Sequence, residues 1–173
     1  MGVELVHGDL TDRHVRASLR RLLRENVLAS FATVDTHGRA HINTAYFAWS
    51  DDWSIFFYSY PDSNHCRNLE RRPSMAVAVF DSHQRWGGAD RGVQLFGAGS
   101  EAVGPSAGVA AAAYSRRFPG FEKWRARTER DEGVFRLRPF RFRPRRAKLF
   151  DERSLGSGRF VEVVVPVDRS KRD

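Results

Sequence analysis

The sequence has few features that cross-link or anchor a chain. It contains a single cysteine, Cys66, in 173 residues. One cysteine excludes an internal disulfide framework and is typical of a reducing compartment. No apolar run approaches the roughly 20 residues that are needed to cross a bilayer. The first residues also lack the basic and then apolar layout of a secretory signal. We therefore expect a cytoplasmic protein with no membrane partner.

Several kinds of functional motif are missing as well. A Rossmann fold needs strands alternating with long helices after a glycine-rich turn, and neither this pattern nor a phosphate-binding loop occurs. His37, His41 and His83 have no metal-like spacing with cysteine or acidic residues, so we expect no metal site. Cys66 has no acid-base partner nearby in the sequence, and we interpret it as structural.

The charge balance is basic, with 29 Lys and Arg against 21 Asp and Glu. Such a balance is compatible with nucleic acid, an anionic ligand or a solvated basic surface. Because the arginines are spread over the chain, the charge alone is weak evidence of any partner. The alternating segment 134–144 could stack on nucleic acid. We favour instead a strand near a sheet edge that is protected by its charges, and do not expect a nucleic-acid partner.

The spacing of apolar residues predicts a mainly β chain with helices between some of the strands. Helices are expected over 12–26, 62–72, 105–117 and 121–130. Strands are expected over 27–35, 39–49, 53–60, 74–81, 91–103, 134–144 and 159–167. The strand over 74–81 is expected to be buried on both faces, and the loop over 82–90 to form a functional lip.

Several short antiparallel strands in series favour a small barrel decorated by helices. The length is that of one domain. We therefore expect a single domain over 1–173, with its core from about 10 to 165 and short polar tails.

Three short motifs follow one another in a characteristic order: ATVD-x-HG at 32–38, FYS-x-x-x-S-x-H-x-x-N-L-x-x-x-P at 57–73, and RGVQLFG at 91–97. Over roughly residues 10–105 this order resembles the pyridoxamine-5'-phosphate-oxidase-like flavin-binding split-barrel superfamily. The resemblance implies a six-stranded antiparallel split barrel, Greek-key-like, with peripheral helices. It also implies a homodimer that holds FMN at the subunit interface. The implied activity is hydride transfer to or from a small organic substrate, as in FMN-dependent oxidoreductases.

The second motif leaves a strand and opens a short helix. A helix N-terminus offers unpaired backbone N–H groups and a favourable dipole to a phosphate. Together with the resemblance, this predicts a phosphate cradle at Ser63, with Tyr58 and Ser59 near the ring or ribityl chain. Asn43 and Thr44 would offer polar groups to the ring edge. The candidate cofactor-binding residues are Asn43, Thr44, Tyr58, Ser59, Ser63, Asn64, His65, Arg67, Arg85, Trp86 and Gln94.

The sequence departs from the family pattern at the phosphate. The basic residues that clamp it in the oxidases are replaced by Asn43, Ala48, Asn64 and His65. Each charge-assisted contact is worth about 1.5–3 kcal/mol, so we do not expect the pyridoxamine-phosphate reaction itself.

Arg67 and Arg85 are the expected replacements for the clamp, and Trp86 and the loop 82–90 would border the substrate. Deazaflavin or haem in the same fold, or a non-catalytic flavin-binding protein, are the alternatives. No catalytic residue is assigned.

Overall fold

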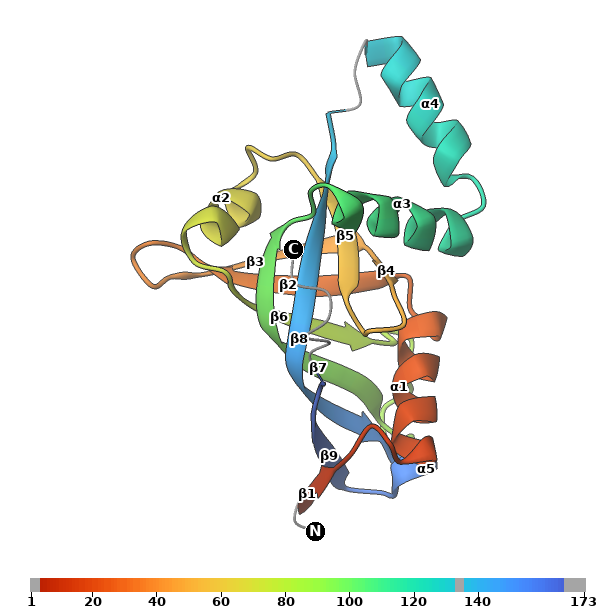
Figure 1. Cartoon of the computed structure of the whole chain (residues 1–173). Coiled ribbons are helices and arrows are strands. Elements are labelled where there is room, and N and C mark those ends of the chain that lie inside the picture. The colour runs from red at the N-terminus through yellow and green to blue at the C-terminus, as the bar shows by residue number, and fades with distance from the viewer. Residues whose placement is uncertain (1–3, 133–135, 167–173) are drawn as a thin grey trace.

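The computed structural model describes residues 4–132 and 136–166, and β-structure dominates it (Figure 1). The strands are β1 (Glu4–Gly8), β2 (Leu28–Val34), β3 (Ala40–Tyr46), β4 (Ala48–Trp49), β5 (Ile55–Ser59), β6 (Ser74–Phe80), β7 (Arg91–Glu101), β8 (Arg138–Asp151) and β9 (Arg159–Val164). The helices are α1 (Arg13–Glu25), α2 (Asn64–Arg71), α3 (Pro105–Arg117), α4 (Phe121–Glu132) and α5 (Glu152–Leu155). The four longer helices match the sequence prediction closely, whereas 134–135 and 167 of the expected strands lie outside the described residues.

The nine strands of the described residues form one mixed sheet, in which seven strands follow the order β1-β9-β8-β7-β6-β2-β3. β5 pairs with the first part of β8, and the short β4 pairs with β5. All pairs are antiparallel except β1 with β9, which is parallel. Among the described strands no pairing joins β3 to β5, so the sheet is not closed.

The expected six-stranded antiparallel barrel is therefore corrected in both strand number and direction. The five residues of β1 alternate too weakly to signal a strand, and it is the parallel pairing with β9 that orders them. β4 has only two residues and continues the course of β3 beyond Phe47.

β8 lies in the interior of the sheet, so its interpretation as a strand near an edge is wrong. It pairs with β5, β7 and β9 along different parts of its length. Its prolines are tolerated because Pro139 lies near the start of the strand and Pro144 lies at a register shift. Opposite Pro144, a Cβ on Gly97 would lie 2.0 Å from the Arg143 carbonyl oxygen, so only glycine fits this bulge.

The expectation that β6 is buried on both faces is wrong, because only one of its faces is buried. Met75, Val77 and Val79 are buried, but the alternate residues Ala76 and Ala78 are only partly covered. The run is continuously apolar because small apolar residues also occupy its outer face, which periodicity alone cannot distinguish from full burial.

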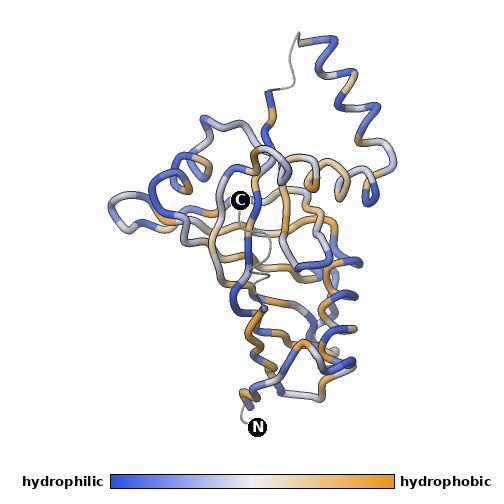
Figure 2. Tube along the Cα trace, viewed as in Figure 1, coloured by the Kyte–Doolittle hydropathy of each residue, from blue (hydrophilic) through white to orange (hydrophobic). Residues whose placement is uncertain are grey.

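The core lies on the concave side of the sheet, where α1 packs along the strands (Figures 1 and 2). Leu19, Leu22 and Leu23 face inward at helical spacing, and the polar side of the helix faces solvent. Asp12 caps the helix by accepting a hydrogen bond from the His14 backbone N–H at 2.7 Å. Within the described ranges, no helix is long and apolar enough to span a bilayer.

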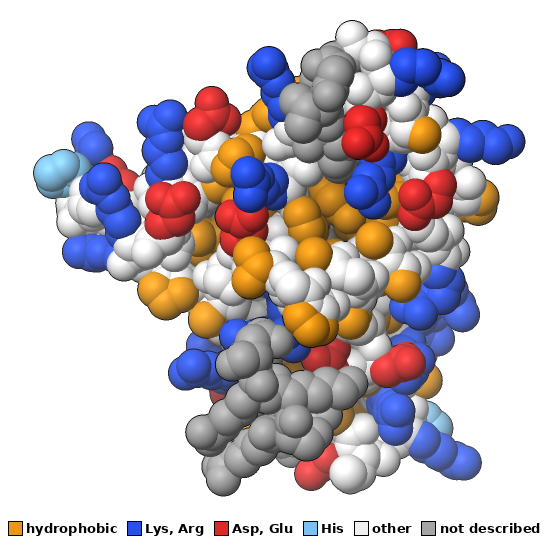
Figure 3. All heavy atoms as spheres, turned by 45° about the horizontal axis from the view of Figure 1, so that its top comes forward, with side chains coloured by type: hydrophobic (Ala, Val, Ile, Leu, Met, Phe, Trp, Pro, Cys, Tyr) orange, Lys and Arg blue, Asp and Glu red, His pale blue; other side chains and the backbone are white. Residues whose placement is uncertain are grey.

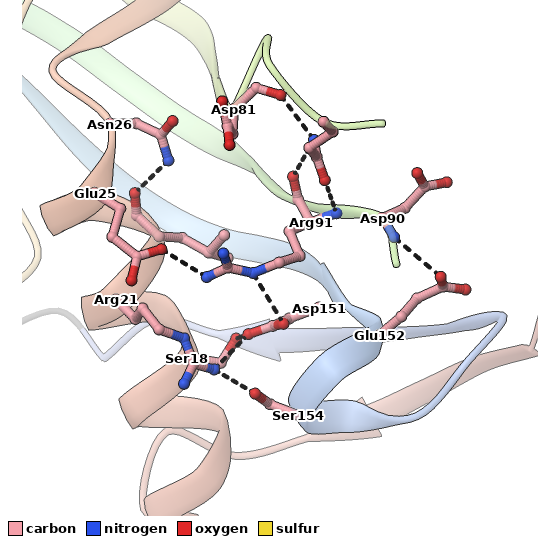
Figure 4. A network of polar contacts seen from close by, with 12 residues as sticks. Ser18, Arg21, Glu25, Asn26, Asp81, Asp90, Arg91, Asp151, Glu152 and Ser154 are labelled. Atoms are coloured by element: carbon pink, nitrogen blue, oxygen red, sulfur yellow. Dashed lines mark hydrogen bonds and ion pairs between the residues drawn. The ribbon is translucent and has the colours of Figure 1, made fainter. Parts of the chain in front are cut away.

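A buried polar network joins α1 to β7 and to the end of β8 (Figure 4). Asp151 is fully buried and accepts hydrogen bonds from Ser18 (2.7 Å), Arg21 (2.7 Å) and Arg91 (3.3 Å). Arg91 also contacts Glu25 at 2.8 Å. Burial alone would raise the pKa of Asp151, but these hydrogen bonds and the two arginine charges hold it below its ordinary value. We call these five residues the Asp151 network.

Candidate functional site

The start of α2 brings three polar side chains together at the end of β5. Ser63 occupies the N-cap position, but its hydroxyl does not cap the helix. Instead it lies 3.2 Å from His65 Nε2 and 3.3 Å from Ser59 Oγ. Ser59 Oγ is itself 2.7 Å from His65 Nε2. The backbone N–H groups of the first helical turn therefore donate no hydrogen bond to the Ser63 side chain. We call Ser59, Ser63 and His65 the serine–histidine cluster.

His65 is held as a neutral imidazole. Its ring stacks on His41 of β3 at a centroid distance of 6.1 Å and lies 6.1 Å from the Phe57 ring. Burial, and then the charge of His41, lower the pKa of His65 below its ordinary value. At neutral pH the ring can donate one hydrogen bond and accept one, but it supplies no positive charge.

The neighbouring Cys66 is fully buried. Burial raises the pKa of its thiol, although the hydroxyls of Ser63 and Ser59 act in the opposite direction. A thiol held protonated in this way is a poor nucleophile.

Asn43 lies on the same face of β3 as His41, two residues further along. Its Oδ1 atom is buried and has no hydrogen-bond partner among the described residues. An unsatisfied buried acceptor costs roughly 1–3 kcal/mol. A hydrogen-bond donor that reached this oxygen would remove that cost.

A cavity of about 890 Å³ lies between the β2–β3 hairpin and α2. It is lined by His41, which stacks on His65, but not by the three residues of the serine–histidine cluster. Its volume lies in the range of ligand sites, about 300–1,000 Å³. Among its lining residues are Asp35, Arg39, His41, Asn64, Arg67 and Arg71. We call it the hairpin cavity.

The charges of the hairpin cavity are unevenly compensated. Asp35 forms an ion pair with Arg39 at 2.7 Å. The Arg39 backbone N–H and guanidinium lower the pKa of Asp35 to about 2. Within residues 4–132 and 136–166, by contrast, Arg67 and Arg71 make no ion pair. Asp62 and Glu70 also line the cavity and formally balance these two charges, so Arg67 is a positive group there that has no direct ion-pair partner among the described residues.

A second cavity, of about 510 Å³, lies where the end of β3 approaches β5 beneath α3 and α4. Six aromatic side chains line it: Tyr46, Tyr58, Tyr114, Phe118, Phe121 and Trp124. We call it the aromatic pocket.

The other predicted residues lie elsewhere in the protomer. Thr44 is exposed on the outer face of β3, opposite to Asn43, and Gln94 is exposed on the same outer face of β7. Arg85 and Trp86 are exposed in the loop 82–90, and Trp86 is fully exposed. The Gln84 amide braces this loop by donating to the Asp81 and Arg91 carbonyls at 2.9 and 3.0 Å.

The structure thus brings Ser59, Ser63 and His65 together and places Asn64 and Arg67 at the hairpin cavity, and their role in cofactor binding stays a prediction. The sequence prediction did not include Arg39, His41 and Arg71, which also line this cavity. Alternation along β3 could have indicated His41, because it shares a face with Asn43. The aromatic residues of α3 and α4 gave no signal beyond helical spacing.

The mixed sheet with its peripheral helices defines a mainly β protein with a ligand-sized cavity beside α2. The family model for pyridoxamine 5'-phosphate oxidase matches residues 15–149, and the chain belongs to this family. No curated protein matches the sequence.

Solved structures at low identity share the fold. A conserved hypothetical protein of Mycobacterium tuberculosis is 21% identical, with a TM-score of 0.64 over 81% of this chain and 86% of that one. A haem-binding protein of Mycobacterium smegmatis is 18% identical, with a TM-score of 0.63 over 88% of this chain and 55% of that one. The haem storage protein HutZ of Vibrio cholerae is 19% identical, with a TM-score of 0.59 over 74% and 88%.

Proposed function

We propose that the protein is a homodimeric FMN-dependent oxidoreductase built on a split barrel, and that the flavin lies along the opening between β3 and β5. The observation that carries this proposal is the arrangement around α2. The serine–histidine cluster lies at the start of α2, next in sequence to Asn64 of the hairpin cavity, which Arg67 also lines. On β3, the Asn43 Oδ1 atom is a buried acceptor without a partner among the described residues.

The phosphate would bind at the start of α2. Backbone N–H groups at a helix N-terminus favour an anion, and Ser63 does not use its hydroxyl to cap them. Arg67 would replace the basic residues that the sequence lacks. Because the pKa of His65 is lowered, its role would be that of a hydrogen-bonding group rather than a charge.

The ring would lie along β3. Oδ1 of Asn43 is an acceptor only, so it suits a ligand N–H, and a flavin ring carries one on its pyrimidine part. Tyr58 and Ser59 would contact the ring or ribityl chain from β5. The bound flavin would supply the hydride chemistry, and the protein would bind and orient it and exclude water.

The second protomer would cover the outer face of β2, β3, β6 and β7. This face exposes large apolar side chains, among them Leu28, Ile42, Tyr46 and Phe80. Small residues such as Ala32 and Ala76 lie between them, so another surface could approach closely. Exposed apolar faces of this kind mark interfaces. A twofold dimer would also place Thr44 and Gln94, which face outward, near a cofactor shared between protomers.

A visible spectrum of freshly purified protein, with mass spectrometry of the released ligand, tests the cofactor. The proposal expects a yellow protein that releases FMN. Haem is the second candidate because two of the similar structures are haem proteins, and a Soret band would favour it. Colourless protein that takes up reduced deazaflavin but not FMN would also overturn the proposal.

The dimer is tested separately by light scattering on Ile42→Arg. Ile42 is 68% exposed in the protomer, so the variant should fold but run as a monomer. Val109→Arg, on an exposed position of α3, is the matched control and should remain a dimer. A native protein that is monomeric at all concentrations would contradict the dimer.

A further inference from the structure

The aromatic pocket differs chemically from the hairpin cavity. Its walls are aromatic rings that pack against one another. The rings of Tyr58 and Tyr114 meet edge-on with their centroids 4.8 Å apart, and the centroids of Tyr114 and Phe121 are 5.1 Å apart. Phe121 lies 6.0 Å from Trp124. Tyr46 meets Phe118 edge-on at 5.9 Å. The pocket is thus preformed by aromatic contacts between two helices and two strands.

The polar groups at the pocket are already engaged or held neutral. The Tyr114 hydroxyl donates to the Tyr46 carbonyl at 2.6 Å. Burial raises the pKa of Tyr58 and of Tyr114, so both stay protonated at neutral pH. None of the residues that line the pocket is charged. The charges that act on Tyr58 are those of Arg125 and Glu122, which have opposite signs and do not line the pocket. A charged ligand would therefore lose its hydration without a counter-charge in the pocket wall, which is unfavourable.

The pocket lies next to the proposed flavin site. Ala45, which lines the pocket, is two residues from Asn43 on the same face of β3, a spacing of about 7 Å. Tyr58 of the pocket directly precedes Ser59 of the serine–histidine cluster. In Figure 3, which brings this end of the molecule forward, hydrophobic side chains gather between charged ones. The aromatic pocket thus shares β3 and β5 with the proposed flavin site, although Tyr58 and Ser59 face opposite sides of β5.

We infer that the aromatic pocket is the substrate subsite and that it binds an uncharged, planar aromatic compound. The inference rests on the proposed function, because it places this compound beside the flavin ring. It assigns a substrate class that differs from a phosphorylated pyridoxamine, whose charges the pocket does not match. Its volume of about 510 Å³ is ample for two or three fused or linked rings.

Binding of N-phenyl-1-naphthylamine tests the subsite without any activity assay. This uncharged aromatic amine fluoresces more strongly in apolar surroundings. The native protein should bind it saturably, both alone and with FMN added. Uncharged 2-naphthol should displace the probe, whereas 2-naphthoate at the same concentration should not.

Trp124→Arg places a charge on the pocket wall at a position that is already partly exposed, and should weaken probe binding at least about tenfold. The control Val109→Arg introduces the same charge on α3, away from the pocket, and should leave probe affinity unchanged. Circular dichroism of both variants checks that the fold is retained.

Three results would overturn the inference: no saturable probe binding, equal affinity in Trp124→Arg and the control, or displacement by 2-naphthoate as readily as by 2-naphthol. Displacement of the probe by FMN would also overturn it, because the pocket would then belong to the cofactor ring. Probe binding that depends on Trp124 in a protein without FMN affinity would instead contradict the proposed function and leave the ligand class of the pocket standing.

Discussion

Two polar clusters in this molecule differ in how far their hydrogen-bonding and charged groups are paired within the chain. In the Asp151 network, both carboxylate oxygens accept hydrogen bonds from groups on α1 and β7, and two arginine charges surround them. Around the serine–histidine cluster, the Asn43 Oδ1 atom has no partner among the described residues, and Arg67 forms no ion pair there. The Asp151 carboxylate is thus satisfied within the chain, although the Arg21 Nε atom beside it has no partner among the described residues. We propose that a ligand completes the open groups of the second cluster.

From this difference we propose that the Asp151 carboxylate serves stability and that Asn43 and Arg67 serve binding. Most buried polar groups in folded proteins are hydrogen-bonded, so an exception requires an explanation. Sites where local rules are broken are often functional. The following predictions test this division, beginning with the largest expected effect.

Replacing Asp151 should destabilise the fold strongly. Asp151→Ala removes the fully buried carboxylate that Arg21 and Arg91 share and leaves Arg91, which is mostly buried, with the partly exposed Glu25 alone. Removing one partner of a buried pair costs about 3–5 kcal/mol. Urea unfolding should show this loss, while FMN affinity of the folded variant should not change. Glu4→Ala removes the exposed partner of Arg159 and should cost less than about 1 kcal/mol. Equal losses in the two variants would contradict the structural role of the network.

Replacing residues of the serine–histidine cluster should weaken FMN binding strongly and change the stability of the fold only a little. Ser63→Ala combined with His65→Ala removes two hydrogen-bonding groups from the proposed phosphate site, and the FMN dissociation constant should rise at least about tenfold. The free energy of unfolding should fall by less than about 2 kcal/mol. The control is His7→Ala with Ser157→Ala, both exposed. Unchanged FMN affinity in the cluster variant would place the phosphate elsewhere.

Asn43→Leu separates stability from binding at one residue. Because the variant removes an unpartnered buried acceptor, the ligand-free protein should be unchanged or more stable by about 1 kcal/mol. FMN affinity should fall by about fivefold. Asn26→Leu is the matched control, since the Asn26 amide donates to the Leu22 carbonyl at 2.8 Å, and it should destabilise. Titration calorimetry and urea unfolding measure both effects. Destabilisation of both variants alike would be evidence against an open acceptor.

The smallest expected effect is the contribution of His65 to the pH dependence of stability. The pKa of His65 is lowered from its ordinary value of 6.5 by burial and by His41. Below pH 6.5 the unfolded chain therefore binds more protons at this residue than the folded chain does, and stability falls as the pH drops. His65→Gln should reduce the difference in melting temperature between pH 7.5 and 5.5, whereas the exposed His83→Gln should not. A pH dependence that is identical in the native protein and His65→Gln would contradict this role.

The sequence revealed most of the local elements, because helical spacing in α1 and β-branched or aromatic runs in β5 and β7 are strong signals. It could not reveal that β8 is central, because its strand partners depend on long-range pairing and on the bulge at Gly97. The parallel pairing of β1 with β9 also joins opposite ends of the sequence.

The candidate site was predictable where residues lie close in the chain, as in Ser59, Ser63 and His65. His41 and Arg39 join it only because the β2–β3 hairpin folds beside α2. The aromatic pocket forms where β3, β5, α3 and α4 come together, and no local sequence pattern predicts that long-range packing. Thr44 and Gln94 face outward, so their predicted role depends on a second protomer.

A comparison of FMN with riboflavin, by calorimetry on native protein and on Arg67→Ala, tests the phosphate site most directly. The two ligands differ only in the phosphate. The native protein should bind FMN at least about tenfold more tightly, a difference of about 1.4 kcal/mol. Arg67→Ala should remove most of that preference and leave riboflavin affinity unchanged. Equal affinity of the native protein for both ligands would contradict a phosphate cradle at the start of α2.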